Sequence, residues 1–164
     1  MTIRPVETTD ANEWSRMRSA LWAGRRHGKE IAKYFAGKAH EPAAVFVADD
    51  GAGVLRGFIE ISLRHDYVAG ATSRPAAFVE GLYIDASHRR KGLARRLFAH
   101  AEQWAAGAGV HEIGSDAALE NQASRAAHLA CGFRETGVVV QFIKPVKAKA
   151  RPPRKRQSRV RASE

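Results

Sequence analysis

The hydrophobic and polar positions of this chain follow two spacings, one typical of strands and one typical of helices. Short runs rich in β-branched and apolar residues predict strands over residues 2–6, 43–48, 54–63, 78–84, 110–115 and 138–144. Apolar residues three or four positions apart predict helices over residues 10–21, 29–37, 122–130 and from Leu93 to a break at residues 107–109. Residues 49–53 contain two Asp and two Gly, which predicts a hairpin turn between two of these strands.

The order of these elements indicates the fold class. Strands and helices alternate as β-α-α-β-β-β-α-β-α-β, so we expect an α/β protein, a mixed twisted sheet flanked by helices. The helix between strands 78–84 and 110–115 should make those two strands adjacent and parallel. We predict one domain over residues 1–144, followed by a basic tail over residues 145–164.

Most of the positive charge belongs to that tail. Residues 145–164 hold eight Lys or Arg and one acid, so they carry +7 of the net charge of +10. With three prolines and few apolar residues, the tail is predicted to be disordered. It is either a solvated appendage or a segment that contacts nucleic acid or an anionic membrane non-specifically.

Other features of the composition indicate a cytoplasmic protein. No stretch of about 18 apolar residues predicts a membrane span. Residues 1–7 lack the apolar run of a signal peptide. The single cysteine, Cys131, cannot form an internal disulfide and suits a reducing compartment, where we expect it to be a small buried side chain.

The most informative stretch joins the central strand to the following helix. The loop Arg89-Arg90-Lys91-Gly92-Leu93-Ala94 places backbone N–H groups and several cations at a helix start, which favours an anion such as pyrophosphate. Neither the Walker nor the Rossmann glycine pattern is present. The alternative is a solvated basic helix start without a ligand.

After this strand, the Arg-x-x-Gly-x-Ala pattern resembles the acetyl-CoA loop of the GCN5-related N-acetyltransferases. The resemblance implies the acetyltransferase (GNAT) fold, with acetyl-CoA as co-substrate and no metal. It implies that the strand backbone holds the pantetheine arm and that the loop holds the pyrophosphate; the residues concerned are Leu82, Tyr83, Ile84, Arg89, Arg90, Lys91, Gly92, Leu93, Ala94 and Arg95.

The central strand also carries a carboxylate. Burying Glu80 on an apolar strand is costly, so its side chain is either functional or neutralised by a nearby arginine. Gly81 suggests a bulge, which would splay the strands and free backbone N–H groups, with Leu82 as the donor to the thioester oxyanion. Asp116, at the carboxyl end of the next strand, either faces the same cleft or is an ordinary loop residue.

A second pattern ends at Gly132-Phe133. Asn121 and His128 at their spacing from it resemble the second cofactor motif of the family. The resemblance implies that Asn121 binds the pantetheine amide and that His128 protonates the leaving thiolate. An imidazole can donate a proton near neutral pH, but His128 can equally be a packed helix residue.

Four segments together resemble the aminoglycoside 6′-N-acetyltransferases: Leu21-Trp22, Arg64-His65-Asp66-Tyr67-Val68, Val79-Glu80-Gly81-Leu82-Tyr83 and Ser115-Asp116-Ala117. The resemblance implies that Trp22 and Tyr67 wall the sugar site, that Glu80 and Asp116 bind or activate the amine, and that the protein is a homodimer conferring antibiotic resistance. Paired carboxylates beside aromatic faces suit a polycationic sugar.

The chain departs from those relatives at two positions, with Ala23 in place of a proline and Gly137 in place of an acidic residue. Three alternatives therefore stay open: an acetyltransferase for another amine, such as a polyamine, a small metabolite or a protein N-terminus; a buried structural role for Trp22; and a basic nucleic-acid-binding module that depends on the tail.

Overall fold

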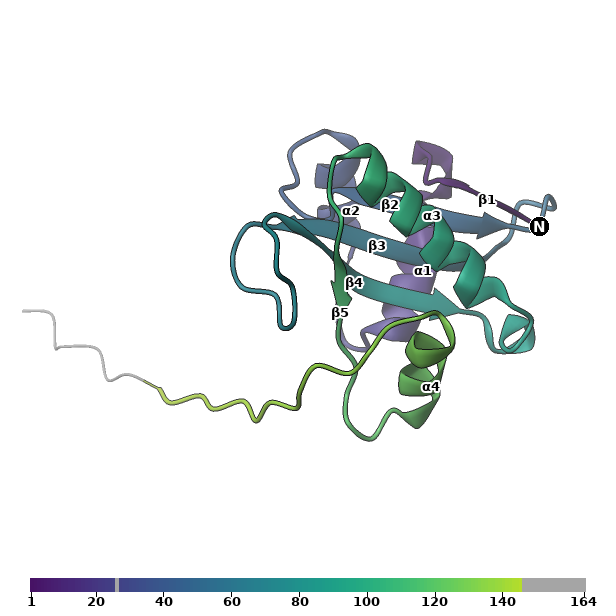
Figure 1. The fold of residues 1–164 in the computed structure, drawn as a ribbon. Coiled ribbons are helices and arrows are strands. Elements are labelled where there is room, and N and C mark those ends of the chain that lie inside the picture. The colour runs from purple at the N-terminus through teal and green to yellow at the C-terminus, as the bar shows by residue number, and fades with distance from the viewer. Residues whose placement is uncertain (26, 146–164) are drawn as a thin grey trace, which may run out of the picture.

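The computed structural model describes residues 1–25 and 27–145, which contain one five-stranded sheet (Figure 1). Its strands lie in chain order and are β1 (Thr2–Pro5), β2 (Ala44–Asp49), β3 (Leu55–Arg64), β4 (Ala76–Ile84) and β5 (Ile113–Ser115). The first four are antiparallel, and β5 runs parallel to β4, as the helical crossover between them predicts.

Helices cover both faces of this sheet. They are α1 (Ala11–Leu21), α2 (Gly28–Phe35), α3 (Leu93–Gly107) and α4 (Gln122–Ala130), with the short 3-10 helices η1 (Thr8–Asp10) and η2 (Ala86–His88). The alternation of β3 divides the core: Phe58 packs with Trp14 of α1, whereas Ile59 packs with Leu97 of α3 on the opposite face. Figure 1 shows α3 crossing one face of the sheet and α1 behind it. The predicted α/β fold with helices on a mixed sheet is confirmed.

The helix predicted over residues 10–21 begins one residue later, at Ala11, and the side chain of Asp10 does not cap it. Its carboxylate instead accepts hydrogen bonds from the Arg4 guanidinium at 2.7 Å and from the Glu7 backbone N–H at 2.8 Å. The bond from Arg4 holds the pKa of Asp10 below its usual range. This contact fastens β1 to the start of α1.

The prediction of a final strand over residues 138–144 is wrong for the described single chain. These residues form no strand there, and five large apolar side chains are 70–99% exposed: Val138, Val139, Val140, Phe142 and Ile143. The pattern is that of a strand, but the strand has no neighbour. Of the predicted basic tail, residues 146–164 lie outside the described residues.

Within residues 1–25 and 27–145, no helix is both long and apolar enough to cross a membrane.

Candidate active site

A bulge in β4 lies at the centre of the candidate site. Glu60 of β3 pairs with Gly81 of β4 and the next residue, Ile61, pairs with Val79, which leaves Glu80 as the extra residue. The bulge predicted from Gly81 is therefore present. It turns the Glu80 side chain out of the regular alternation and bends the strand at this point.

The sheet opens at the same level. The pairing of β4 with β5 covers only three residue pairs and ends where Val79 lies opposite Ser115, while β4 continues to Ile84. The edge of β4 beyond Glu80 therefore has no β5 partner. Backbone groups of residues 80–84 on this edge can bond a ligand, as expected for the pantetheine arm along Leu82, Tyr83 and Ile84.

The Glu80 carboxylate is held by two residues of β3. The Ser62 hydroxyl and the Arg64 Nε (3.2 Å) donate to Oε1, and Arg64 Nη2 lies 3.0 Å from both carboxylate oxygens. The Arg64 guanidinium in turn stacks on the ring of Phe78 at 3.3 Å. Glu80 is thus paired with an arginine, one of the two outcomes expected for it, and Oε2 is the less engaged oxygen.

The sequence offered a signal for Ser62 and Arg64 that motif reasoning missed. Both lie on the strand that forms the hairpin with the Glu80 strand, two residues apart and therefore on one face. A polar pair on one face, opposite a carboxylate on the neighbouring apolar strand, is the pattern that would have identified them.

Trp22 covers the bulge from the α1 side. A Cβ atom added at Gly81 would lie within 2.5 Å of the Trp22 indole, so the ring rests directly on the glycine backbone. The Arg18 guanidinium contacts two tryptophan rings, with its Cζ 5.2 Å from the centroid of Trp22 and 5.6 Å from that of Trp14. Trp22 is half-buried and borders the site, and also contacts the core ring of Phe58 at a centroid distance of 6.2 Å.

Beneath Trp22 lies a carboxylate that the sequence did not single out. Glu60 is 2% exposed, accepts a hydrogen bond from Trp14 Nε1 at 2.8 Å and pairs with Arg18 at 3.2 Å. Arg18 also pairs with the exposed Glu30 at 2.9 Å. Burial raises the pKa of Glu60 to about 7, against the opposing effects of Arg18 and Trp14. Glu60, Trp14 and Arg18 together form the buried layer that supports the Trp22 indole.

The two other expected residues on the acceptor side are open to solvent. Tyr67 is 73% exposed in the loop between β3 and β4. Asp116 is exposed directly after Ser115, whose strand neighbour Val79 precedes Glu80. The fold thus brings Asp116 to the same end of the β4–β5 pair as Glu80.

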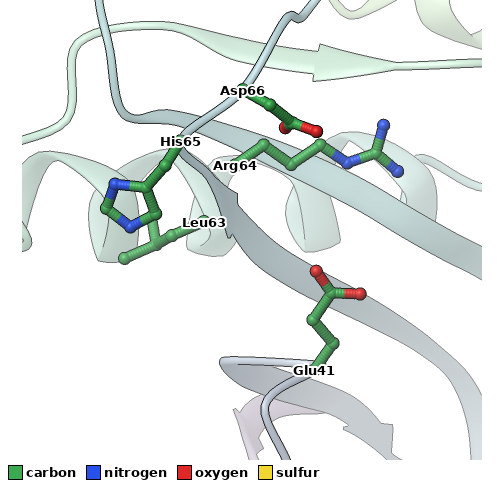
Figure 2. Close-up of a pocket in the computed structure, with 5 residues that line it drawn as sticks. All are labelled: Glu41, Leu63, Arg64, His65 and Asp66. Carbon is green, nitrogen blue, oxygen red and sulfur yellow. The ribbon is translucent and has the colours of Figure 1, made fainter.

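A hollow of about 470 Å³ lies at the carboxyl end of β3 (Figure 2). It is lined by Glu41, Leu63, Arg64, His65 and Asp66. Figure 2 shows Arg64 and Asp66 on one side of the end of β3 and Leu63 and His65 on the other, with Glu41 on a neighbouring segment. Because Arg64 also holds Glu80, this hollow adjoins the candidate site and adds negative groups suited to a cation.

His128 is held inside the sheet–α4 junction. Its Nδ1 bonds the Ser124 carbonyl at 2.8 Å, its Nε2 bonds the Ser115 hydroxyl at 2.8 Å, and its ring packs against Phe98 and Phe133. The Ser124 carbonyl can only accept, so Nδ1 carries a proton, whereas the Ser115 hydroxyl can either donate to Nε2 or accept from it. His128 is therefore a packed, hydrogen-bonded residue that also reaches the end of β5.

The Asn121 side chain precedes α4 and accepts a hydrogen bond from the Ser124 backbone N–H at 3.0 Å. This bond caps the helix and leaves the carboxamide NH₂ group of Asn121 as a donor.

The predicted anion-binding loop, residues 89–94, has open space around the glycine at its centre. Gly92, at φ +77°, precedes α3, and a Cβ added to it would meet no atom within 4 Å. Arg90 also has a positive φ, 59°, and Arg89 Nε bonds the Ile84 carbonyl at 2.9 Å, which ties the loop to β4. Leu93 is buried and anchors the helix start, Ala94 is half-buried, and the side chains of Arg90, Lys91 and Arg95 are exposed. These residues fit a polyanionic group at the N-terminus of α3.

Within the described residues, no group of three or more His, Cys, Asp or Glu side chains could hold a metal ion.

A sheet that splits beside a bulged, carboxylate-bearing strand and an open helix N-terminus defines a coenzyme A-dependent acyltransferase scaffold. Residues 11–133 match the Acetyltransferase (GNAT) family, and the chain belongs to this family.

Similar proteins include aminoglycoside-modifying enzymes. An aminoglycoside N(6′)-acetyltransferase type 1 from Klebsiella aerogenes is 44% identical over 147 residues, 88% of this chain and 96% of that protein. The crystal structure of an aminoglycoside antibiotic 6′-N-acetyltransferase from Acinetobacter haemolyticus superposes with a TM-score of 0.80 at 34% identity, covering 90% of this chain and 100% of the other. A third match, also 34% identical with a TM-score of 0.79 and covering 88% of this chain and 98% of the other, holds the bisubstrate analogue CoA-S-monomethyl-acetylneamine.

Proposed function

We propose that this protein transfers an acetyl group from acetyl-CoA to the 6′-amine of aminoglycoside antibiotics and thereby confers resistance. The observation that carries the proposal is the Glu80 carboxylate, held by Ser62 and Arg64 at the bulge where β4 and β5 separate. The similarity to 6′-N-acetyltransferases over most of the chain supports the same reaction.

On the acceptor side, Glu80 is the proposed base. Near neutral pH an aminoglycoside amine is largely protonated and has no lone pair for attack, so a carboxylate must first take its proton. Among the described residues, Oε2 of Glu80 accepts from Arg64 alone and keeps a lone-pair direction for this purpose. Asp116 holds the ammonium group, and Trp22 and Tyr67 wall the sugar.

The freed amine then attacks the thioester carbonyl, a C–N bond forms, and the C–S bond breaks. The backbone N–H of Leu82, on the edge of β4 beyond the bulge, is the proposed donor to the oxyanion. The departing thiolate needs a proton, and His128 is the proposed source. With a proton on Nε2, His128 can donate to the Ser115 hydroxyl 2.8 Å away, and Ser115 passes its own proton to the thiolate, so Ser115 lies on the proton route.

On the donor side, Arg89 to Arg95 hold the pyrophosphate of acetyl-CoA, with Leu82, Tyr83, Ile84 and Asn121 along the pantetheine arm. The support is the open space at Gly92, the exposed cations beside it and the free donor of Asn121.

A thiol-release assay with acetyl-CoA tests the proposal. Kanamycin-like substrates with a 6′-amine should release coenzyme A, whereas analogues with a 6′-hydroxyl should not. Equal turnover of both kinds, or turnover of polyamines alone, would support the alternative, an acetyltransferase for another amine.

The proposed setting is the cytoplasm, and the proposed assembly is a homodimer. Cys131 is the chain's single cysteine, which suits a reducing compartment. The exposed apolar residues 138–143 support an additional protein contact. Non-specific binding of anions by the basic tail stays a prediction.

A further inference from the structure

The loop between β3 and β4, residues 65–75, is tied to a single carboxylate outside it. The backbone N–H groups of Thr72 and Ser73 donate to Oε2 of Glu112 at 2.8 Å and 2.6 Å. The Ser73 hydroxyl donates to the same oxygen at 2.6 Å, and the Thr72 hydroxyl donates to Oε1 at 3.2 Å. Hydrogen bonds to an ionised acceptor are stronger than those between neutral groups, so this set of four donors holds the loop firmly.

Glu112 is itself fixed to the sheet. It directly precedes β5, and its carbonyl accepts a hydrogen bond from the Ala77 N–H of β4 at 2.9 Å. The bonds from Ser73 and Thr72 lower the pKa of Glu112 to about 2, so the carboxylate stays ionised under ordinary assay conditions. The loop is therefore fastened to a rigid part of the fold.

The side chains of the loop provide little packing of their own. Residues 69–73 are Ala, Gly, Ala, Thr and Ser. Val68 is buried and packs on the backbone of Gly114, where an added Cβ would lie 2.6 Å from Val68 Cγ1. Arg134 Nη2 adds one bond, to the Gly70 carbonyl at 3.2 Å. A segment with few buried contacts opens at low cost, so its hydrogen bonds decide whether it stays in place.

The fastening fixes two groups of the acceptor side relative to each other. Tyr67 directly precedes Val68, which rests on Gly114 of β5, and Asp116 directly follows the last residue of the same strand. Both proposed contacts to the aminoglycoside are therefore positioned by β5. Groups that are in place before a ligand arrives bind it without the entropic cost of ordering them.

We infer that Glu112 is a positioning residue for the acceptor, which holds the loop against β5 so that Tyr67 is already in place when the aminoglycoside binds. Glu112 acts through Tyr67 and not by contact with the substrate. The inference deepens the proposed function and rests on its assignment of Tyr67 to the sugar site.

Steady-state kinetics of Glu112→Ala tests this role. The KM for kanamycin should rise about tenfold, because a smaller fraction of molecules has the loop in place, while kcat and the affinity for acetyl-CoA stay near wild type. Glu112→Gln keeps one acceptor oxygen and should cause a smaller rise. Glu102→Ala is the matched control: it removes the same charge from a groove that borders the loop, without removing a bond to Thr72 or Ser73, and should leave KM unchanged.

A double-mutant cycle separates positioning from a general loss of stability. In a Tyr67→Ala protein, Glu112→Ala should change KM by at most about twofold, because the residue through which it acts is gone. Effects on KM that multiply in the double variant would overturn the inference. An equal loss of acetyl-CoA affinity in Glu112→Ala would also overturn it, since the role would then be structural.

Hydrogen exchange followed by mass spectrometry examines the loop without substrate. The amides of residues 65–75 should exchange faster in Glu112→Ala than in wild type, while those of β4 and α3 exchange as before. Equal exchange of the loop in both proteins would overturn the inference whatever the substrate is. A wild type that acetylates no aminoglycoside would instead overturn the proposed function, together with the part of the inference that names the acceptor.

Discussion

The buried carboxylate of Glu60 should make the stability of the protein fall with rising pH. Burial raises its pKa from an ordinary 4.5 to about 7 in the native state. Among the described residues, the charged and titratable groups that face it are Arg18 of α1, Glu30 and Tyr34 of α2 and Glu80 of β4. Between these two pKa values the folded protein binds the proton more tightly than the unfolded chain does. The contribution of Glu60 to the free energy of unfolding is therefore fully present below pH 4.5 and is lost as the pH rises through 7.

The magnitude follows from the displacement of the pKa. Each pH unit over which only the native carboxyl keeps its proton changes the free energy of unfolding by about 1.4 kcal/mol. From pH 5 to pH 8.5, this one group should therefore reduce the free energy of unfolding by about 2.5 kcal/mol.

Urea denaturation of wild type and Glu60→Gln over this pH range measures the effect. Glutamine keeps the acceptor for the Trp14 indole but does not titrate, so the difference in free energy of unfolding between the two proteins should change by that amount. Groups such as Glu112, whose pKa is lowered to about 2 by bonds from Ser73 and Thr72, titrate in both proteins and cancel.

Glu30→Gln is the matched control. It removes the exposed carboxylate on the same arginine and should leave most of the pH slope in place, because burial contributes more than Glu30 to the raised pKa of Glu60. Parallel stability curves for wild type and Glu60→Gln would refute the reasoning.

The remaining predictions concern binding and catalysis. The double variant Arg90→Glu, Lys91→Glu should weaken acetyl-CoA binding at least tenfold in calorimetry. Because both side chains are exposed, the melting temperature of the ligand-free protein should not change, and an unchanged acetyl-CoA affinity would show that the pyrophosphate binds elsewhere. Glu80→Gln should lower kcat by roughly 10²–10⁴, the usual contribution of a general base, while Asp116→Asn should chiefly raise KM for the antibiotic; the reverse pattern in steady-state kinetics would exchange their roles. Trp22→Ala should raise KM for the aminoglycoside about tenfold or more and leave acetyl-CoA affinity nearly intact, and equal losses of both would make Trp22 a structural residue.

Local patterns were sufficient to predict most of the fold. The helix over residues 122–130 was predicted with the bounds it has, from its apolar spacing and the stop at Gly132; the structure adds that Asn121 caps its start. The bulge followed from a glycine beside a carboxylate on an apolar strand. These features depend on residues close together in sequence.

The contacts that position the site depend on residues far apart. Trp14 and Glu60 are 46 positions apart and meet only because α1 packs across β3, which no local pattern reveals. Arg64 was within the recognised segments, but its bond to Glu80 depends on the register of the hairpin. The prediction of a strand over residues 138–144 was wrong for a related reason. The composition of this segment favours a strand, but a strand also needs a paired neighbour, and none of the described strands lies beside it.

The contact between Trp22 and Gly81 also limits how this protein can change under antibiotic selection. Any side chain at position 81 would push into the indole, whose own position is held from beneath by Arg18, so single substitutions there should lose function before they broaden it. Tyr67, by contrast, belongs to an exposed loop and can be replaced without disturbing the core. New substrate ranges should therefore arise first through residues 65–75, while the floor of the cleft stays unchanged.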